Sequence, residues 1–333
     1  MNVFLVTSPF QYICANEARC YYATDDNILL LVKQDMEPAI SQMAKIVNEN
    51  DWTRVIHIER SQRTFSMPKA IKAVKKIKKN DSIKHFFHGE YNGWRTKFLL
   101  RNLKPDTEVY FDDGSLTLGE YERFIKTKHT FYRPRFVSDL IIKMQGLEPI
   151  GRLPISKKLE IFTIFDIKNP TVPVIKNDFS NMRETYNLNY DSQRDHSNEY
   201  ALFLGQGSID CHGTIKSFYL DAIKRFAKTT GKKILYAPHR TETSNIREEV
   251  SKIENLTYYD STLPIELEIS EKQLNITDIG GIASTALYTL KIIYPHIKIY
   301  SAKQSEEEYH TQVTYTDNEL MLELLKPIGI ELF

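Results

Sequence analysis

The chain has few cysteines, no excess of one charge and no long apolar run. Its 333 residues include three cysteines, Cys14, Cys20 and Cys211, which are too few and too scattered for a disulfide framework or a zinc site. This scarcity indicates a reducing compartment. The formal net charge of +1 at pH 7 gives no global electrostatic drive toward nucleic acid. We therefore expect neither a disulfide-rich secreted domain nor a nucleic-acid partner.

Hydrophobic segments are short throughout. No apolar run is long enough to cross a bilayer, and the first residues, Met1 to Pro9, lack the basic region of a signal peptide. They are typical instead of a buried strand that ends in a Ser-Pro turn. The sequence also lacks internal repeats and low-complexity tracts. With 41% apolar and 26% charged residues, the composition is ordinary for a soluble globular protein, which we expect to be cytoplasmic.

Strand-like and helix-like segments alternate in both halves of the chain. The first half predicts strands at 3–6, 27–32, 54–58, 83–87 and 109–111, with helices at 10–21, 38–48, 68–79 and 94–102. The second half predicts strands at 200–204, 233–236, 256–258, 276–279 and 297–300, with helices at 215–230, 264–270, 284–294 and 318–325. Such alternation favours parallel strands joined by crossover helices.

The alternation weakens between residues 153 and 200. Pro170 and Pro173 exclude a helix interior there, and the stretch 186–199 is polar. We therefore predict an N-terminal Rossmann-like lobe at 1–165, a linker region at 166–199, and a C-terminal Rossmann-like lobe with a closing helix at 200–333. Two α/β lobes of similar size predict parallel sheets that face a central cleft.

Two adjacent acids, Asp112 and Asp113, follow the strand expected at 109–111 and precede Gly114. Open α/β sheets bind ligands at the carboxyl ends of their strands, and glycine lets the backbone turn sharply there. Two close carboxylates resist ionising together, so one pKa rises and that group can accept a proton near neutral pH. Asp is also a common turn former. Taken alone, the pair indicates either a general base or an ordinary turn.

Two segments of the second half are typical of phosphate binding. Pro238 and His239 follow a strand, where an imidazole can meet a phosphate. Ser284 and Thr285 precede an apolar helix, and the free N–H groups of a helix N-terminus attract anions. Glu266, in a first helical turn, can hold ribose hydroxyls. Each signal also has an ordinary explanation: a surface histidine, helix capping, and an acid favoured by the helix dipole.

The order of these motifs resembles that of the bacterial sialyltransferases. That family carries an Asp/Glu-Asp-Gly motif, a His-Pro motif and a Ser-Ser or Ser-Thr motif, which correspond here to Asp112-Asp113-Gly114, His239 and Ser284-Thr285. The opening Thr7-Ser8-Pro9-Phe10-Gln11 is similar to the start of the lipooligosaccharide branch, and the polysialyltransferases are a related branch. One departure is Arg240, which follows the histidine where the family has proline.

The resemblance implies an inverting sialyltransferase of GT-B type. It would move sialic acid from CMP-sialic acid to a galactoside or sialoside of a cell-surface glycan, in lipooligosaccharide or capsule, without a metal ion or other cofactor. Asp113 would deprotonate the acceptor hydroxyl, Asp112 would position it, and His239 would bind the phosphate and stabilise the departing CMP. The other implied CMP contacts are Ser284, Thr285, Glu266, Gly281, Pro238 and Gln206. On the acceptor side we expect Ser8, Gln11, Asn92 and Trp94.

A basic amphipathic segment from Lys69 to Lys79 has one lysine-rich face. Such a face either contacts anionic lipid headgroups or is simply solvated. Because an enzyme acting on a lipid-linked glycan meets its acceptor at a membrane, we expect peripheral contact with the inner membrane through this segment.

Two other functions remain open. One is a GT-B enzyme that uses a UDP- or GDP-sugar, and the other is a non-catalytic nucleotide- or glycan-binding protein of capsule assembly.

Overall fold

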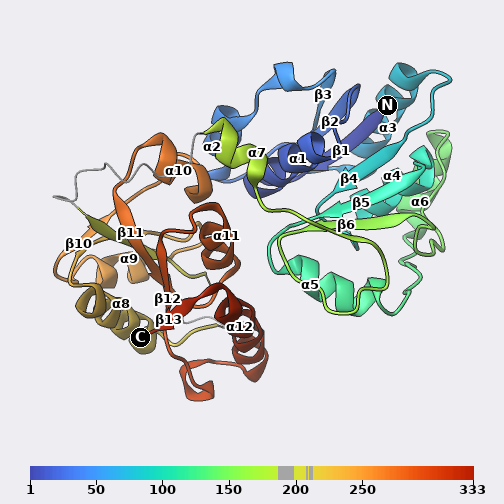
Figure 1. Cartoon of the computed structure of the whole chain (residues 1–333). Coiled ribbons are helices and arrows are strands. Elements are labelled where there is room, and N and C mark those ends of the chain that lie inside the picture. Colours follow the sequence, from blue (N-terminus) through green and yellow to red (C-terminus); the bar gives the residue numbers. More distant parts are fainter. Residues whose placement is uncertain (187–198, 208, 210–212) are drawn as a thin grey trace. The chain divides into compact units, whose positions relative to one another are not determined.

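The computed structural model describes residues 1–186, 199–207, 209 and 213–333. The chain forms two compact units, Met1–Asn181 and Met182–Phe333, which run from blue to yellow-green and from there to red in Figure 1. Each unit contains one parallel β-sheet with helices between its strands. The prediction of two Rossmann-like units with parallel sheets is confirmed.

Unit 1 contains seven parallel strands in the order β3-β2-β1-β4-β5-β6-β7. All residues of β1 and β2 are buried, as expected for central strands with both faces covered. The chain adds strands outward from β1 to β3 and then outward on the other side from β4 to β7. The bounds are β1 Asn2–Val6, β2 Asn27–Val32, β3 Arg54–Ile58, β4 His85–His88, β5 Thr107–Phe111, β6 Leu159–Thr163 and β7 Val174–Lys176.

The helices of unit 1 are α1 Pro9–Tyr21, α2 Ala39–Ile46, α3 Arg63–Lys78, α4 Trp94–Leu103, α5 Leu116–Glu120 and α6 Phe136–Met144, while α7 Ser180–Thr185 spans the boundary between the units. One hydrophobic core packs α3, α4 and α6 against the sheet. Strands β6 and β7 and helices α5 to α7 were not expected from the sequence. Strand β7 lies within the residues that we assigned to the linker and pairs with β6 in the first sheet.

Helix α3 begins at Arg63, so Pro68 lies inside the helix and not at its first position, as we had expected. A proline inside a helix has no N–H to donate to the carbonyl four residues earlier, which here is that of Thr64. That carbonyl accepts instead from Nε2 of Gln145, at 3.1 Å. Gln145 directly follows α6, so its side chain replaces the missing helical bond and fastens α6 to α3.

The described residues of unit 2 form six parallel strands in the order β10-β9-β8-β11-β12-β13. The strands are β8 Tyr200–Leu204, β9 Lys233–Ala237, β10 Leu256–Tyr258, β11 Ile276–Gly281, β12 Lys298–Ser301 and β13 Ile330–Leu332, and the helices are α8 Lys216–Thr230, α9 Ser244–Val250, α10 Ile265–Glu271, α11 Thr285–Ile293 and α12 Gln312–Leu325. As in unit 1, the first strands of the chain are added outward on one side, from β8 to β10. Strand β11 then pairs with the other side of β8, so the strand order reverses between β8 and β11. Helix α9 and strand β13 were not expected from the sequence.

No helix in the described part of the chain is long and apolar enough to span a bilayer. Cys14 is buried and Cys20 is exposed, and neither forms a disulfide. Cys211 and residues 187–198 of the predicted linker lie outside the described residues.

Candidate active site

The site residues predicted in unit 1 follow three neighbouring strands. Ser8 and Gln11 come after β1, Asn92 and Trp94 after β4, and Asp112-Asp113 after β5. Because the strands are parallel, these segments share the carboxyl edge of the sheet. The boundary between β1 and β4 is the point where the strand order reverses, which is where open α/β sheets bind their ligands.

Asp112 is fully buried at the end of β5. Its Oδ1 accepts from the hydroxyl of Thr163 at 2.6 Å, and its Oδ2 accepts from the N–H of Ile164 at 2.7 Å. Burial raises the pKa of Asp112 to about 7, and the Thr163 and Ile164 hydrogen bonds oppose that rise. The side chain therefore fastens the end of β5 to the end of β6.

Asp113 differs from its neighbour because it is only partly buried. Its backbone N–H donates to the hydroxyl of Thr117 at 3.3 Å. Gly114 follows with a φ of 66°, a left-handed conformation that glycine adopts without strain. Of the two adjacent acids, Asp113 is the one that a substrate can reach.

Gln11 is buried directly beside the β1–β4 boundary. Its Oε1 accepts from the N–H and the hydroxyl of Thr7, at 2.9 and 3.1 Å. Its Nε2 is buried and has no hydrogen-bond partner among the residues that the structure describes. A Cβ atom placed on Gly89, after β4, would lie 2.7 Å from the Gln11 side chain. Ser8 caps α1, since its Oγ accepts from the N–H of Gln11 at 3.2 Å.

Several polar residues at this edge were not predicted. The Thr7 hydroxyl also lies 2.9 Å from Oε1 of Glu90, so its single hydrogen is shared between Glu90 and Gln11. The Thr7 carbonyl accepts from Gln34 Nε2 and from Arg60 Nη2, both at 2.9 Å. These residues follow β1 to β4, so the signal for finding them was their position directly after predicted strands. Glu90 is a second partly buried carboxylate at this edge.

The two residues predicted after β4 have different surroundings. Trp94 belongs to the core, where its ring stacks on Phe98 with centroids 4.9 Å apart. The Asn92 side chain is partly exposed. The N–H of Asn92 donates to Oε1 of Glu120 at 2.9 Å, and that buried carboxylate also accepts from the N–H of Tyr91 at 2.6 Å. Glu120 therefore fixes the loop, whereas Trp94 is buried in the core of unit 1.

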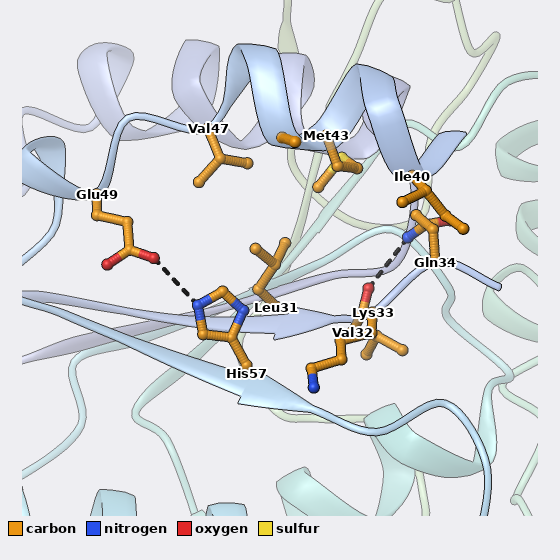
Figure 2. A pocket seen from close by; sticks show the side chains of 10 residues that line it. Leu31, Val32, Lys33, Gln34, Ile40, Met43, Val47, Glu49 and His57 are labelled. Atoms are coloured by element: carbon orange, nitrogen blue, oxygen red, sulfur yellow. Dashed lines mark hydrogen bonds and ion pairs between the residues drawn. The ribbon is translucent and has the colours of Figure 1, made fainter. Parts of the chain in front are cut away.

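A pocket of about 300 Å³ lies between α2 and the strands β2 and β3. Figure 2 shows the His57 ring facing Glu49, and the Nε2–Oε1 distance is 3.0 Å. Gln34 lines this pocket and also contacts Thr7, which connects the pocket to the β1–β4 boundary. The pocket is lined by Leu31, Val32, Lys33, Gln34, Ile40, Met43, Ala44, Val47, Glu49 and His57, and it contains none of the predicted site residues.

In unit 2 the predicted residues again follow neighbouring strands, in the order β9-β8-β11. Gln206 comes after β8, Pro238 and His239 come after β9, and Ser284-Thr285 come after β11. The loops after β8 and β9 touch, because the N–H of Gly205 donates to the Ala237 carbonyl at 2.7 Å. These residues therefore share the carboxyl edge of the second sheet.

His239 rests on Gly207, where an added Cβ would lie 2.8 Å from the imidazole. Its Nδ1 accepts from the N–H of Thr241 at 3.2 Å and lies 2.8 Å from the Thr241 hydroxyl. Burial and the nearby Arg240 lower the pKa of His239. An Nδ1 that accepts leaves the proton on Nε2, so the neutral ring presents a single N–H donor.

Ser284 is the residue before the first turn of α11, yet its side chain makes no capping hydrogen bond. Ordinary capping by this hydroxyl, one of the two explanations open from the sequence, is therefore absent. Gly281 lies against β8, and an added Cβ would come 3.2 Å from the Leu204 carbonyl. Gly281 therefore packs closely against β8, where a side chain would be crowded.

Two glutamates lie in the first turn of α10, and both are buried. Glu268 accepts from the Leu263 N–H at 2.7 Å and from the Tyr259 hydroxyl at 2.8 Å, so it orders the loop before the helix. Burial raises the pKa of Glu266. The backbone N–H of Glu266 donates to its own carboxylate and opposes that rise.

Within the described ranges, no group of three His, Cys, Asp or Glu side chains could hold a metal ion. No protein-family model matches the sequence, and no curated protein matches it.

Solved structures do resemble the chain. It is similar to the α/β-galactoside α-2,3-sialyltransferase of Photobacterium phosphoreum, with 13% identity, 99% of this chain and 97% of that chain covered, and a TM-score of 0.54. It is also similar to a Listeria monocytogenes structure described as a UDP-N-acetylglucosamine 2-epimerase, with 9% identity, 98% and 88% covered, and a TM-score of 0.51.

At these identities the likeness shows the fold alone, which is of the GT-B type. One neighbour is a glycosyltransferase and the other is described as an epimerase of a nucleotide sugar.

Proposed function

We propose that this protein is a glycosyltransferase that moves sialic acid from CMP-sialic acid to a galactoside or sialoside acceptor of a cell-surface glycan. The observation that carries the proposal is that the two acids after β5 have different surroundings. Asp112 is locked in hydrogen bonds to β6, whereas Asp113 remains partly exposed at the carboxyl edge of the sheet. The motif resemblance and the GT-B fold support the same reaction class.

On the acceptor side, Asp113 removes the proton from the attacking hydroxyl. The acceptor oxygen bonds to the anomeric carbon of sialic acid while the bond from that carbon to the CMP phosphate oxygen breaks, so the configuration inverts. The acceptor lies along the β1–β4 boundary, where Gln11 Nε2 has no partner in the described part of the chain and the Asn92 side chain is partly exposed. Glu90 is the alternative base, because it is a second carboxylate at this edge.

On the donor side, the departing phosphate keeps the electron pair of the broken bond. The Nε2–H of His239, the hydroxyls of Ser284 and Thr285, and the N–H groups at the start of α11 stabilise this charge. Glu266 holds the ribose, and Gln206 and Pro238 border the same edge. The leaving group carries a single phosphate, so this scheme needs no metal ion.

The nucleotide preference is tested by thermal unfolding of the full chain with CMP, UDP and GDP. We expect CMP to raise the unfolding temperature and UDP and GDP to leave it unchanged. Stabilisation by UDP without CMP would contradict sialyl transfer and favour a GT-B enzyme of another nucleotide sugar. No stabilisation by any nucleotide would contradict a donor site in unit 2.

Two paired substitutions locate the phosphate. Ser284→Ala with Thr285→Ala should abolish the CMP-induced shift in unfolding temperature. The matched control is Thr243→Ala with Ser244→Ala at the start of α9 in the same unit, where Thr243 is a structural cap. The control should keep the shift, and an equal loss in both pairs would place the phosphate elsewhere.

The protonation state in which His239 acts is tested by comparing two substitutions. Glutamine retains an N–H donor and alanine does not, so His239→Ala should lower kcat by about 100-fold and His239→Gln by clearly less. Because burial lowers the pKa of His239, the wild-type rate should not fall as the pH rises through 6.5. A fall there that His239→Gln abolishes would show instead that the protonated imidazole is required.

A further inference from the structure

Helix α6 exposes a continuous row of large apolar side chains. Phe136 is 84% exposed, Leu140 61% and Met144 81%, and Val137 beside them is 75% exposed. The spacing of four residues places the first three on one face of the helix. The opposite face carries Ile142, which is fully buried in the core of unit 1. The helix is therefore anchored on one side and leaves its other side without a partner on the described chain.

This exposure is large for a soluble surface. Apolar residues scattered singly on a surface are normal, but a contiguous apolar group marks an interaction site. The group stands on a regular helix that is fastened to α3 through Gln145 and Thr64. The apolar row, defined here as Phe136, Val137, Leu140 and Met144, is thus held in place by the fold.

The surface around the apolar row is basic. Arg133, Arg135 and Lys143 are exposed beside it. Helix α3, which packs in the same core as α6, exposes Lys69, Lys72, Lys75 and Lys76, and Lys79 directly after the helix is also exposed; these five residues are called the lysine stripe. Between Arg60 and Asn80 the sequence contains no acidic residue. Near α6, Asp139 is partly buried and its carboxylate accepts from the N–H of Arg135 at 3.1 Å.

We propose that the apolar row of α6 and the lysine stripe of α3 together form a docking surface for an anionic lipid bilayer. The apolar row enters the region between headgroups and acyl chains, and the arginines and lysines meet the anionic headgroups. The positive charge of this surface favours an anionic bilayer over a second copy of the chain. A second copy would bring two basic surfaces together, and like-charge repulsion opposes that contact. The proposal does not depend on the reaction that the protein catalyses.

The direct test is sedimentation of the full chain with phosphatidylcholine vesicles, with and without phosphatidylglycerol. The wild type should bind the anionic vesicles and bind pure phosphatidylcholine much more weakly. Phe136→Gln, Leu140→Gln and Met144→Gln combined should weaken binding to anionic vesicles by more than about tenfold. The matched control is Val313→Gln with Leu320→Gln on α12, because these apolar residues are also 71% and 56% exposed.

The lysine stripe is tested separately. Lys72→Gln, Lys76→Gln and Lys79→Gln combined should remove most of the preference for phosphatidylglycerol, whereas Lys224→Gln with Lys228→Gln on α8 should not. Absence of wild-type binding to anionic vesicles would overturn the proposal, and so would equal binding by the α6 variant and its α12 control. A wild-type dimer that the α6 substitutions convert to a monomer, with vesicle binding unchanged, would overturn it in favour of self-association.

A single-site probe covers the case in which the triple variant fails to fold. Met144→Trp should shift its fluorescence emission to the blue when anionic vesicles are added, because the indole moves into an apolar layer. Leu320→Trp on α12 should show no such shift. An unshifted emission from the Met144→Trp protein while it is sedimented with vesicles would place the bound surface elsewhere.

Discussion

Asp112 makes the stability of the protein depend on pH in a definite direction. Burial raises its pKa from 3.8 to about 7, so the folded protein holds a proton that the unfolded chain has already released. As the pH rises from about 4 to about 7, Asp112 should therefore lower the free energy of unfolding by up to about 1.4 kcal/mol per pH unit.

Asp112→Asn should reduce this loss of stability. The amide can donate to Thr163 and accept from Ile164, which reproduces the hydrogen bonds of the protonated acid. Urea unfolding between pH 4 and pH 7 measures the difference, with Asp113→Asn as the neighbouring control. If wild type and Asp112→Asn lose stability equally over this range, the raised pKa does not belong to Asp112.

At the residue scale, the sequence predicts where chemistry-bearing side chains lie but not what surrounds them. Asp112, Asp113 and His239 were predictable because each directly follows an apolar strand. The burial of Asp112 and Trp94, and the polar contacts of Glu90 and Thr7, depend on residues that are distant in the sequence. No local pattern carries that information.

At the element scale, one buried ionic cluster joins β4, α4 and β5. Glu108 Oε1 lies 3.0 Å from His88 Nε2 and 3.7 Å from Lys97 Nζ. Burial would raise the pKa of Glu108, but Lys97, His88 and Ser156 outweigh it and hold that pKa at about 2. Lys97 also lies 3.4 Å above the ring of Tyr91.

Glu108→Ala would leave a buried lysine without its counter-charge. We expect it to lower the free energy of unfolding by about 3–5 kcal/mol, as for other broken buried pairs. Glu148→Ala removes an exposed acid that pairs with Lys104 at 3.3 Å, and it should cost less than about 1 kcal/mol. Similar losses in both variants, measured by denaturant unfolding, would show that the cluster contributes little.

A second element-scale prediction concerns the packing of α8 on β11. A Cβ on Gly280 would lie 2.4 Å from the ring of Phe226, so Gly280→Ala should lower the free energy of unfolding by about 1–3 kcal/mol. An added Cβ on Gly119 in α5 would meet no atom within 4 Å among the described residues outside its own chain neighbours and helix backbone, so Gly119→Ala should be neutral or slightly stabilising. Calorimetry of both variants checks the contrast, and a neutral Gly280→Ala would mean that the ring moves freely.

Most strands and long helices were predictable because their apolar residues follow a regular period. Helix α6 was not predicted from the sequence, and most of its large apolar side chains are exposed, with Ile142 the residue of the helix that is buried. The start of α3 was misplaced because proline is usually found at the first turn of a helix. Here the Gln145 side chain supplies the bond that makes an interior proline tolerable.

At the scale of the whole molecule, both units follow one design. Each is a parallel sheet whose strand order reverses once, at β1–β4 in unit 1 and at β8–β11 in unit 2. The predicted acceptor residues lie at the carboxyl edge of the first sheet, and most of the predicted nucleotide residues lie at that of the second. The fold class was predictable because alternating strands and helices permit few other arrangements. The substrate was not, because GT-B proteins share a fold and differ in their loops.

The central claim is that Asp113 acts as the base in sialyl transfer. The measurement is CMP release from CMP-sialic acid with a panel of galactoside and sialoside acceptors, for the wild type, Asp113→Ala and Glu90→Gln. We predict acceptor-dependent CMP release by the wild type, a loss of at least about 1,000-fold in Asp113→Ala with its CMP-induced thermal shift retained, and a smaller loss in Glu90→Gln. Wild-type protein that releases no CMP with any acceptor, or an Asp113→Ala variant that keeps full turnover, would contradict it.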